Sequence, residues 1–216
     1  MKKFFTLIVA TLMASSMMAQ MHGAMTFAGP SSINVLTQNT GNACDTVRFE
    51  MASMSAGNIT LPVMQGMAAI PPFTIENVAF SKGENHVISI AEQTFTSKVT
   101  VNGEEKNIEG SSISGSYNMA DNSLTLKAVF KYGSMPFDLT YEVKAYYVKP
   151  VASAITVNVG GAFIYGNDGV TYNVRKYIDG DAEKVDVEIP TYTLDNTVMG
   201  NLTLGTYTVK GLTYDE

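Results

Sequence analysis

The sequence predicts an all-β protein: an antiparallel up-and-down barrel, followed by a partial second copy of the same β domain. Three observations support this fold class. Apolar and polar residues alternate with a period of two along most of the chain, whereas helical spacing is almost absent after residue 19. Turn-forming residues separate the alternating segments. Short blocks of sequence recur in the same order in both halves of the chain.

The first 19 residues have the layout of a secretory signal peptide. Lys2 and Lys3 precede an apolar run from Phe4 to Ala14, and small residues then lead to Ala19. The run is too short to span a bilayer, and no later stretch is apolar for long enough. We therefore predict a signal peptide over residues 1–19 and an exported chain that is periplasmic, on the cell surface or secreted. The residue directly after the predicted cleavage site at Ala19 is not a cysteine, so a lipoprotein anchor is not predicted.

Strands with one buried face are indicated by three clear alternating segments. Val47, Phe49 and Met51 alternate with charged residues, and the same pattern covers residues 124–132 and 137–145. Parallel strands that are buried on both faces give unbroken apolar runs instead. The alternation therefore favours antiparallel strands with one packed and one solvated face.

Turns between these strands are predicted from local sequence. Asn102-Gly103 suits a tight hairpin, because both central positions of that turn need positive φ. The segments Met119–Asn122 and Gly133–Pro136 separate further pairs of strands. Because successive strands are joined by hairpins, an up-and-down barrel over residues 20–149 is the predicted architecture.

A duplication is predicted from four blocks that recur in the same order. GNITL at Gly57–Leu61 is matched by GNLTL at Gly200–Leu204. The other pairs are AMTFAG from Ala24 with AITVNVGG from Ala154, VRFEMASM from Val47 with VDVEIPTY from Val185, and FTIENVAF from Phe73 with YTVKGLTY from Tyr207. We place the boundary between the copies at Lys149-Pro150-Val151.

One irregularity is shared by the last pair of blocks. The apolar period of two slips by one residue at Glu76-Asn77 and again at Lys210-Gly211. A slip of one residue would turn the buried set outward unless the strand contains a bulge or a sharp bend. The sequence therefore predicts a bend at the same place in both strands.

The second copy, residues 150–216, matches only the first half of the first copy. A half barrel leaves unpaired strand edges, which must be covered, paired or completed. Two hypotheses account for it. The sequence is a truncated product of a longer two-barrel protein, or its open edges pair with the first copy or with another molecule, as in self-association.

Several of these blocks resemble a known family. GNITLP, IPPFTIENVAF, SGSYNMADNSLTL and FKYGSMPFDLTYEVKAYYVK resemble the calycin-like β-barrel domains exported by Bacteroidetes, which are lipocalin-like in shape. The resemblance covers nearly all of Ala24–Lys149 and, more weakly, Ala154–Glu216. It implies a closed antiparallel barrel of about eight strands and a cell-envelope or secreted location, and it implies little about activity. The chain has no tryptophan, so the Gly-x-Trp signature of true lipocalins is missing.

Charge and chemistry exclude several function classes. The net charge of −6 repels phosphate backbones and anionic lipids, so no nucleic-acid partner is predicted. Cys44 is the only cysteine, so no internal disulfide can form. Neither His22 nor His86 lies in a recognisable triad motif. The acidic segment Asp179–Glu188 resembles a calcium loop, but Lys184 occupies the position that needs glycine. We predict no enzyme activity, no cofactor and no metal site.

The barrel interior and its lid remain as the candidate site for a small apolar ligand. Large aromatic residues would tend to fill the interior, whereas methionines could line an adaptable pocket. The segment Pro62–Pro72 could act as a lid or as a packed plug over one end of the barrel. The candidate residues are Phe49, Met51, Met64, Met67, Phe73, Ile75, Phe130, Tyr132, Phe137 and Tyr141. The alternative is a structural or adhesive module of the cell envelope that uses sheet edges or outer faces.

Overall fold

The protein is all-β in the computed structural model, which describes residues 23–65, 69–83, 86–159, 163–197 and 200–213. The predicted signal peptide therefore lies outside the described residues. No α-helix occurs in the described part of the chain, so this part contains no helix that could cross a membrane. The chain divides into two compact units, Met1–Ala145 and Tyr146–Glu216.

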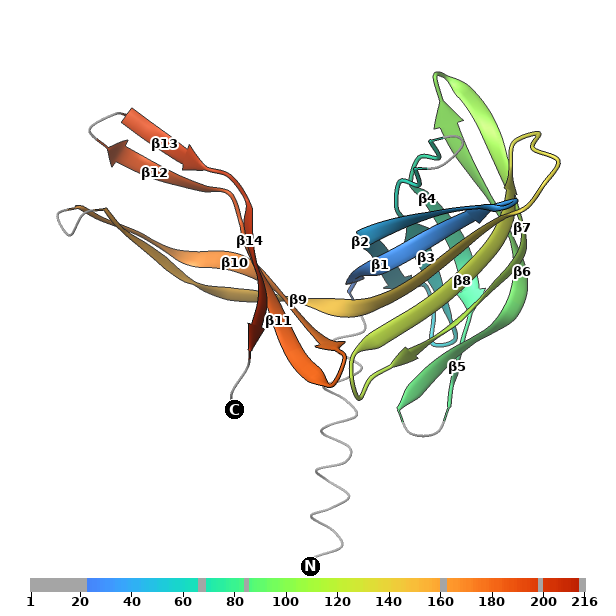
Figure 1. Ribbon diagram of the computed structural model, residues 1–216, viewed down its shortest axis with the longest axis horizontal. Helices are drawn as coiled ribbons and strands as arrows, with labels where there is room; N and C mark the ends of the chain where they lie inside the picture. The colour runs from blue at the N-terminus through green and yellow to red at the C-terminus, as the bar shows by residue number, and fades with distance from the viewer. Residues whose placement is uncertain (1–22, 66–68, 84–85, 160–162, 198–199, 214–216) are drawn as a thin grey trace, which may run out of the picture. The chain divides into compact units, whose positions relative to one another are not determined.

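The first unit is a single curved antiparallel sheet (Figure 1). Its strand order is β4-β3-β2-β1-β9-β8-β7-β6-β5. Neighbours in the chain are therefore neighbours in the sheet except for β4 and β5, which are its two ends, and the first strand pairs with the ninth. This is the predicted up-and-down order. The strands are β1 (Met25–Val35), β2 (Gln38–Met51), β3 (Ala56–Leu61), β4 (Phe73–Ala79), β5 (Ser81–Lys82), β6 (Val87–Val101), β7 (Glu104–Asn118), β8 (Ser123–Tyr132) and β9 (Leu139–Val159).

The prediction of a closed barrel is wrong for this sheet, because the backbone ladder is interrupted between β4 and β6. The two strands contact each other, but side chains bridge them at what we call the β4–β6 seam. Ser97 Oγ donates a hydrogen bond to the Thr74 carbonyl at 2.6 Å. The Gln93 side-chain amide bonds to both the N–H and the C=O of Ala79, each at 2.8 Å. We attribute the interruption to a bulge in β4, which breaks the regular row of backbone groups that a ladder needs.

The predicted alternation and turns are confirmed in the first unit. Along β8, Leu124, Leu126, Ala128 and Phe130 are buried, and the residues between them are exposed or half-buried. The hairpin between β6 and β7 has positive φ at Asn102 (52°) and Gly103 (82°), as the Asn-Gly pair predicts. The other two predicted turns lie between β7 and β8 and between β8 and β9.

The predicted bends are also confirmed. On β4, the pairs with β3 shift from Ile59↔Ile75 to Gly57↔Val78, which leaves one extra residue on β4. Asn77, in this bulge, has φ 56°. The second unit contains the same device, where Gly211 has φ 66° and the register shifts from Val187↔Val209 to Val185↔Leu212. Both irregularities therefore arise where the apolar period slips.

The second unit contains the later part of β9 with five more strands. They are β10 (Phe163–Asp179), β11 (Ala182–Ile189), β12 (Tyr192–Thr197), β13 (Gly200–Leu204) and β14 (Tyr207–Thr213). β10 pairs with β9 and β11, and β14 pairs with β11, while β12 and β13 form a separate two-stranded sheet. The predicted boundary at Lys149-Pro150-Val151 lies inside β9 and pairs with β10, so it is not a loop.

The strand pairing does not reproduce the predicted equivalence of GNITL and GNLTL. GNITL, in β3, pairs with the strand that carries FTIENVAF. GNLTL, in β13, pairs with β12, and the YTVKGLTY strand pairs with β11 instead. In both units, however, a side chain on the neighbouring strand accepts a hydrogen bond from the bulge: Asn58 Oδ1 from Asn77 N (3.1 Å) and Asp186 Oδ1 from Gly211 N (2.8 Å).

Asp186 is the one buried polar residue among the described residues of the second unit, with 6% of its surface exposed. The Arg175 guanidinium forms an ion pair with its carboxylate at 2.5 Å and lies over the Tyr177 ring at 4.8 Å. Burial acts to raise the pKa of Asp186, but the Gly211 N–H and the Arg175 guanidinium outweigh it and lower that pKa.

The second unit is expected to lose stability in acid because of Asp186. A lowered folded pKa stabilises the fold above the unfolded carboxyl value of about 3.9, and this stabilisation is lost as the pH falls through the lower folded value. The Gly211 amide, which contacts the carboxylate, should report the titration in an NMR pH series. Asp186→Asn should be less stable at neutral pH and show a flatter acid profile. A Gly211 titration midpoint at or above that of free aspartate would contradict this expectation.

Candidate functional site

The interior of the first unit, where the apolar ligand was predicted, is packed with side chains. Phe130 is fully buried, and its ring lies 5.3 Å from the Phe73 centroid and 6.4 Å from that of Phe95. Among the predicted site residues, Phe73, Ile75, Phe130 and Tyr141 lie in this core with Phe49 and Met64 also buried. Met51, Tyr132 and Phe137 are half-buried, and Met67 lies outside the described residues.

The described parts of the Pro62–Pro72 segment form a plug rather than a raised lid. Met64 and Ile70 exchange two backbone hydrogen bonds of 3.0 Å each. Their exposed fractions are 2% and 0%, so both side chains are packed into the first unit. The segment therefore contributes to the core at its end of the sheet.

A small cavity of about 230 Å³ lies beside this plug, and we call it the Asp45 pocket. Strands β1 and β2, the start of β9 and the plug all contribute to it. Its walls combine one carboxylate and several polar groups with apolar side chains from the plug and β1. The lining residues are Ser31, Ile33, Thr40, Gly41, Asn42, Asp45, Val63, Met64, Gln65 and Tyr141.

A bulge between β1 and β2 places Asp45 in this pocket. The pairs Gly29↔Asp45 and Ser31↔Asn42 leave one extra residue on β2, and such irregularities re-aim side chains. Asp45 is only 7% exposed. Ser31 Oγ and the Tyr141 hydroxyl donate to its Oδ2, the latter at 3.4 Å, and the Asn42 side-chain amide donates to its Oδ1. The carboxylate is therefore held by three neutral donors.

Tyr141 remains a hydrogen-bond donor because its ionisation is suppressed. Burial, followed by the nearby negative charge of Asp45, raises the pKa of the Tyr141 hydroxyl well above its ordinary value. Its exposed fraction is 1%, so the side chain is part of the core, and the residue also lines the pocket. The sequence predicts Tyr141 as a large residue of the barrel interior, and the structure adds the polar contact of its hydroxyl with Asp45.

Tyr141 is expected to make the first unit sensitive to alkali. Tyrosine in the unfolded chain ionises at about pH 10, whereas the pKa of the buried Tyr141 hydroxyl is raised. The fold therefore loses stability as the pH rises above about 10 towards the raised pKa. Tyr141→Phe lacks the ionisable group and should lose less stability than the original protein over this range. Urea denaturation at a series of alkaline pH values measures the difference. Parallel losses in both proteins would contradict the expectation.

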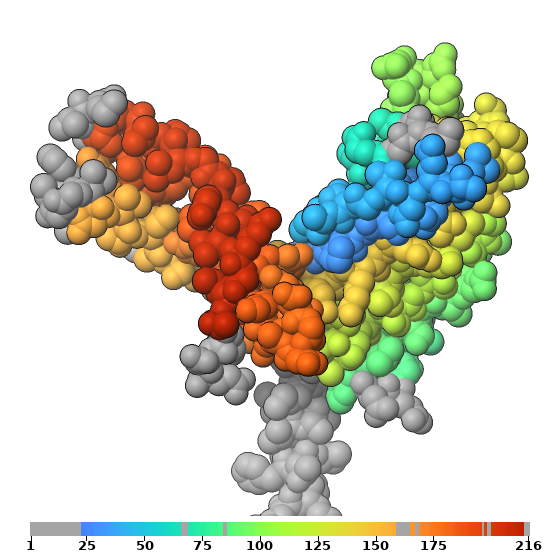
Figure 2. Space-filling model, viewed as in Figure 1, coloured from blue at the N-terminus to red at the C-terminus, as the bar shows by residue number. Residues whose placement is uncertain are grey.

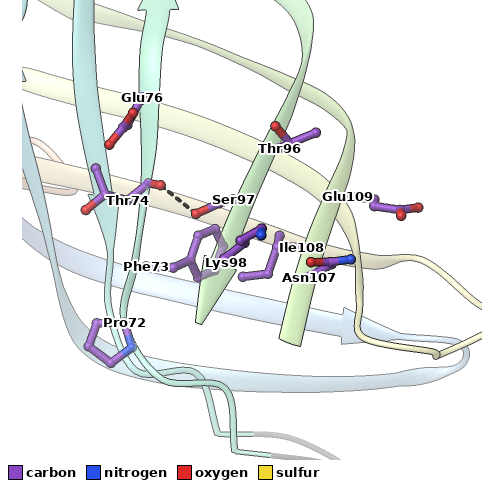
Figure 3. A pocket seen from close by; sticks show the side chains of 10 residues that line it. All are labelled: Pro72, Phe73, Thr74, Glu76, Thr96, Ser97, Lys98, Asn107, Ile108 and Glu109. Carbon is purple, nitrogen blue, oxygen red and sulfur yellow. Dashed lines mark hydrogen bonds between the residues drawn. The ribbon is translucent and has the colours of Figure 1, made fainter. Parts of the chain in front are cut away.

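A larger groove of about 740 Å³ follows the β4–β6 seam on the surface of the first unit (Figure 3). Thr74 and Glu76 line it from β4, and Thr96, Ser97 and Lys98 line it from β6. Figure 3 shows the hydrogen bond from Ser97 to Thr74 crossing the gap between the two strands. Most of these side chains are solvated, and the groove contains no buried charge.

Chemical groups for catalysis are sparse in the described part of the chain. His86 is the one histidine there, and it occupies the exposed turn before β6 with φ 63°. Among the described residues, no three His, Cys, Asp or Glu side chains are grouped closely enough to hold a metal ion. The acidic segment Asp179–Glu188 forms the β10–β11 hairpin with Gly180 at positive φ. The Asp45 pocket thus offers a carboxylate and hydrogen-bonding groups, which suit binding.

Three polar residues of the pocket, Ser31, Asn42 and Asp45, were absent from the sequence-based candidates. The alternation along β2 contains a signal for Asp45. Because every second residue of a strand lies on the same face, Asp45 lies on the inward face with Val47 and Phe49. A carboxylate on a buried face is informative because charged groups are rarely buried without a partner. Ser31 and Asn42 lie at the bulge between β1 and β2, and the period of two along β2 does not reveal a bulge.

Comparison of the chain with protein-family models, curated proteins and solved structures finds no match.

Proposed function

We propose that the chain is a non-enzymatic, exported binding protein whose first unit holds a small ligand in the Asp45 pocket. The observation that carries the proposal is a carboxylate that is 7% exposed and lines a cavity of about 230 Å³. Ligand sites are concave and combine apolar walls with a few convergent polar groups, as this pocket does. The packed interior favours this end of the sheet over the interior of the first unit as the place of the ligand.

The ligand must be small and partly polar. The cavity lies below the range of about 300 to 1,000 Å³ that is usual for drug-sized ligands. Met64 and Ile33, which are 2% and 5% exposed, offer apolar contact, whereas the Asp45 carboxylate offers a polar one. The proposed ligand is therefore more polar than the purely apolar compound that the sequence predicts.

A ligand screen by NMR tests this function. The mature chain, labelled with ¹⁵N, is titrated with mixtures of small neutral, cationic and anionic compounds. We expect shifts of the amides of Ser31, Gly41 and Asn42, which line the pocket. The amide of Ser97, at the β4–β6 seam, serves as the internal control and should not move. A complete screen that leaves the pocket amides unmoved would remove the proposal.

A second candidate function, an interaction module, is favoured by the apolar surface of the second unit. Leu202 and Leu204 on β13 are 45% and 40% exposed, and Tyr207 and Leu212 on β14 are 65% and 42% exposed. On the face seen in Figure 2, strands β12, β13 and β14 lie at the surface. Exposed apolar residues on strands with unpaired edges are typical of association sites.

Sedimentation of the mature chain over a range of concentrations tests the second candidate as self-association. Leu202→Ser with Leu204→Ser should shift the protein towards monomer if β13 forms the contact. The matched control is Leu36→Ser, which changes a leucine of similar type that is 68% exposed on the first unit. A monomer at all concentrations for the unaltered chain would exclude self-association through these strands.

A further inference from the structure

We propose that the Asp45 pocket selects a small organic cation, a primary ammonium compound whose charged group binds the Asp45 carboxylate. This inference rests on the proposed ligand-binding function and names the chemical class of its ligand. Its basis is a buried carboxylate with which no Lys or Arg of the described residues forms an ion pair.

The charge balance of the pocket is the first argument. Asp45 receives hydrogen bonds from Ser31, Asn42 and Tyr141, and all three donors are neutral. In the described part of the chain, no Lys or Arg side chain forms an ion pair with Asp45, whereas the other buried carboxylate, Asp186, is paired with Arg175. Burying a carboxylate without an opposite charge is costly, and a bound cation removes that cost.

The side chains that could act as metal ligands in the pocket argue against a metal ion as the cation. Calcium takes about six to eight oxygen ligands, and several of them are usually carboxylates. Among the described residues that line this cavity, Asp45 is the single carboxylate. An ammonium group needs only about three acceptors, and the hydroxyl of Thr40 and the amide of Gln65 line the same cavity beside Asp45.

The remaining walls indicate an organic ligand of limited size. Ile33, Val63 and Met64 face the cavity and suit a short hydrocarbon chain or a small ring. A volume of about 230 Å³ holds about eight water-sized groups, at roughly 30 Å³ each. The n-butylammonium ion has a matching size and chemistry, and 1-butanol and butyrate have the same chain with neutral and negative ends.

The test is an NMR titration of the mature chain with these three probes at equal ionic strength. We expect n-butylammonium to shift the amides of Gly41 and Asn42 and to bind at least about tenfold more tightly than 1-butanol, as expected for a hydrogen bond to a charged group. Butyrate should give no shifts. Equal binding of n-butylammonium and 1-butanol would overturn the charge-based inference and leave the ligand-binding function in place.

Asp45→Asn is the matching variant, because it removes the charge and keeps the shape of the side chain. It should lower the affinity for n-butylammonium at least about tenfold and leave that for 1-butanol unchanged. Asp138→Asn, at an exposed carboxylate between β8 and β9, is the control and should bind like the original protein. If Asp45→Asn does not fold, the order of the three probes on the original protein still decides. No shift with n-butylammonium, while neutral compounds of the screen do bind, would also overturn the inference.

Discussion

Phe130→Ala is expected to lower the free energy of unfolding of the first unit by about 3 to 5 kcal/mol. Phe130 has no exposed surface, and its ring contacts those of Phe73 on β4 and Phe95 on β6. It therefore joins β8 to the two strands that meet at the β4–β6 seam. Truncation removes the contacts that hold these strands together where no backbone ladder does.

Chemical denaturation followed by far-UV circular dichroism measures this loss. Met54→Ala is the matched control, because Met54 is 75% exposed and its truncation should change stability by less than about 0.5 kcal/mol. A loss below about 1 kcal/mol for Phe130→Ala would mean that the interior is not packed around this ring. In that case, the interior of the first unit would again become a candidate place for a ligand.

Gly29→Ala is expected to have the second largest effect, with a loss of about 1 to 3 kcal/mol or more. A Cβ at Gly29 would lie 2.2 Å from the Lys144 carbonyl oxygen and 2.6 Å from the Ala145 Cα. Both atoms belong to the backbone of β9, so they cannot rotate away as the end of a side chain can. The substitution must push β1 away from β9.

The same substitution should also disturb the Asp45 pocket, because Gly29 is the strand partner of Asp45. Gly41→Ala is the matched control for stability only, since its Cβ would meet only the Ser31 carbonyl oxygen at an ordinary 3.8 Å. Denaturation compares the stability of the two variants, and the NMR titration of Gly29→Ala against the original protein measures the effect on the pocket. Equal stability of Gly29→Ala and Gly41→Ala would contradict the close approach of β1 and β9.

Features that depend on neighbouring residues could be predicted from the sequence. The inward face of β8 follows from the period of two, and the Asn102-Gly103 turn follows from the residues that tolerate positive φ. The bends at Asn77 and Gly211 follow from the slipped period, and both occur. The resemblance to exported calycin-like domains, the duplication and the export of the chain stay predictions.

Features that depend on how distant strands meet could not be predicted. The interruption between β4 and β6 depends on the distance between the edges of these two strands. The alternation of apolar and polar residues along each strand is the same whether the seam between them is open or closed. GNLTL pairs with β12 although its sequence matches GNITL. Strand pairing depends on both partner segments, so similarity of one segment does not fix its neighbour. At the site, Met64 and Tyr141 were predicted from their apolar character, but a search for apolar residues passes over Asp45.

The pairing of Gln93 with Ala79 has a consequence for how the first unit opens. Elsewhere in the sheet, separating two strands requires a whole row of peptide hydrogen bonds to break together. At the β4–β6 seam, rotation of the Gln93 and Ser97 side chains breaks the hydrogen bonds between β4 and β6 without disturbing either backbone. The Ala79 amide should therefore exchange its proton with solvent through local fluctuations, while the amides inside the β6–β7 ladder await global unfolding.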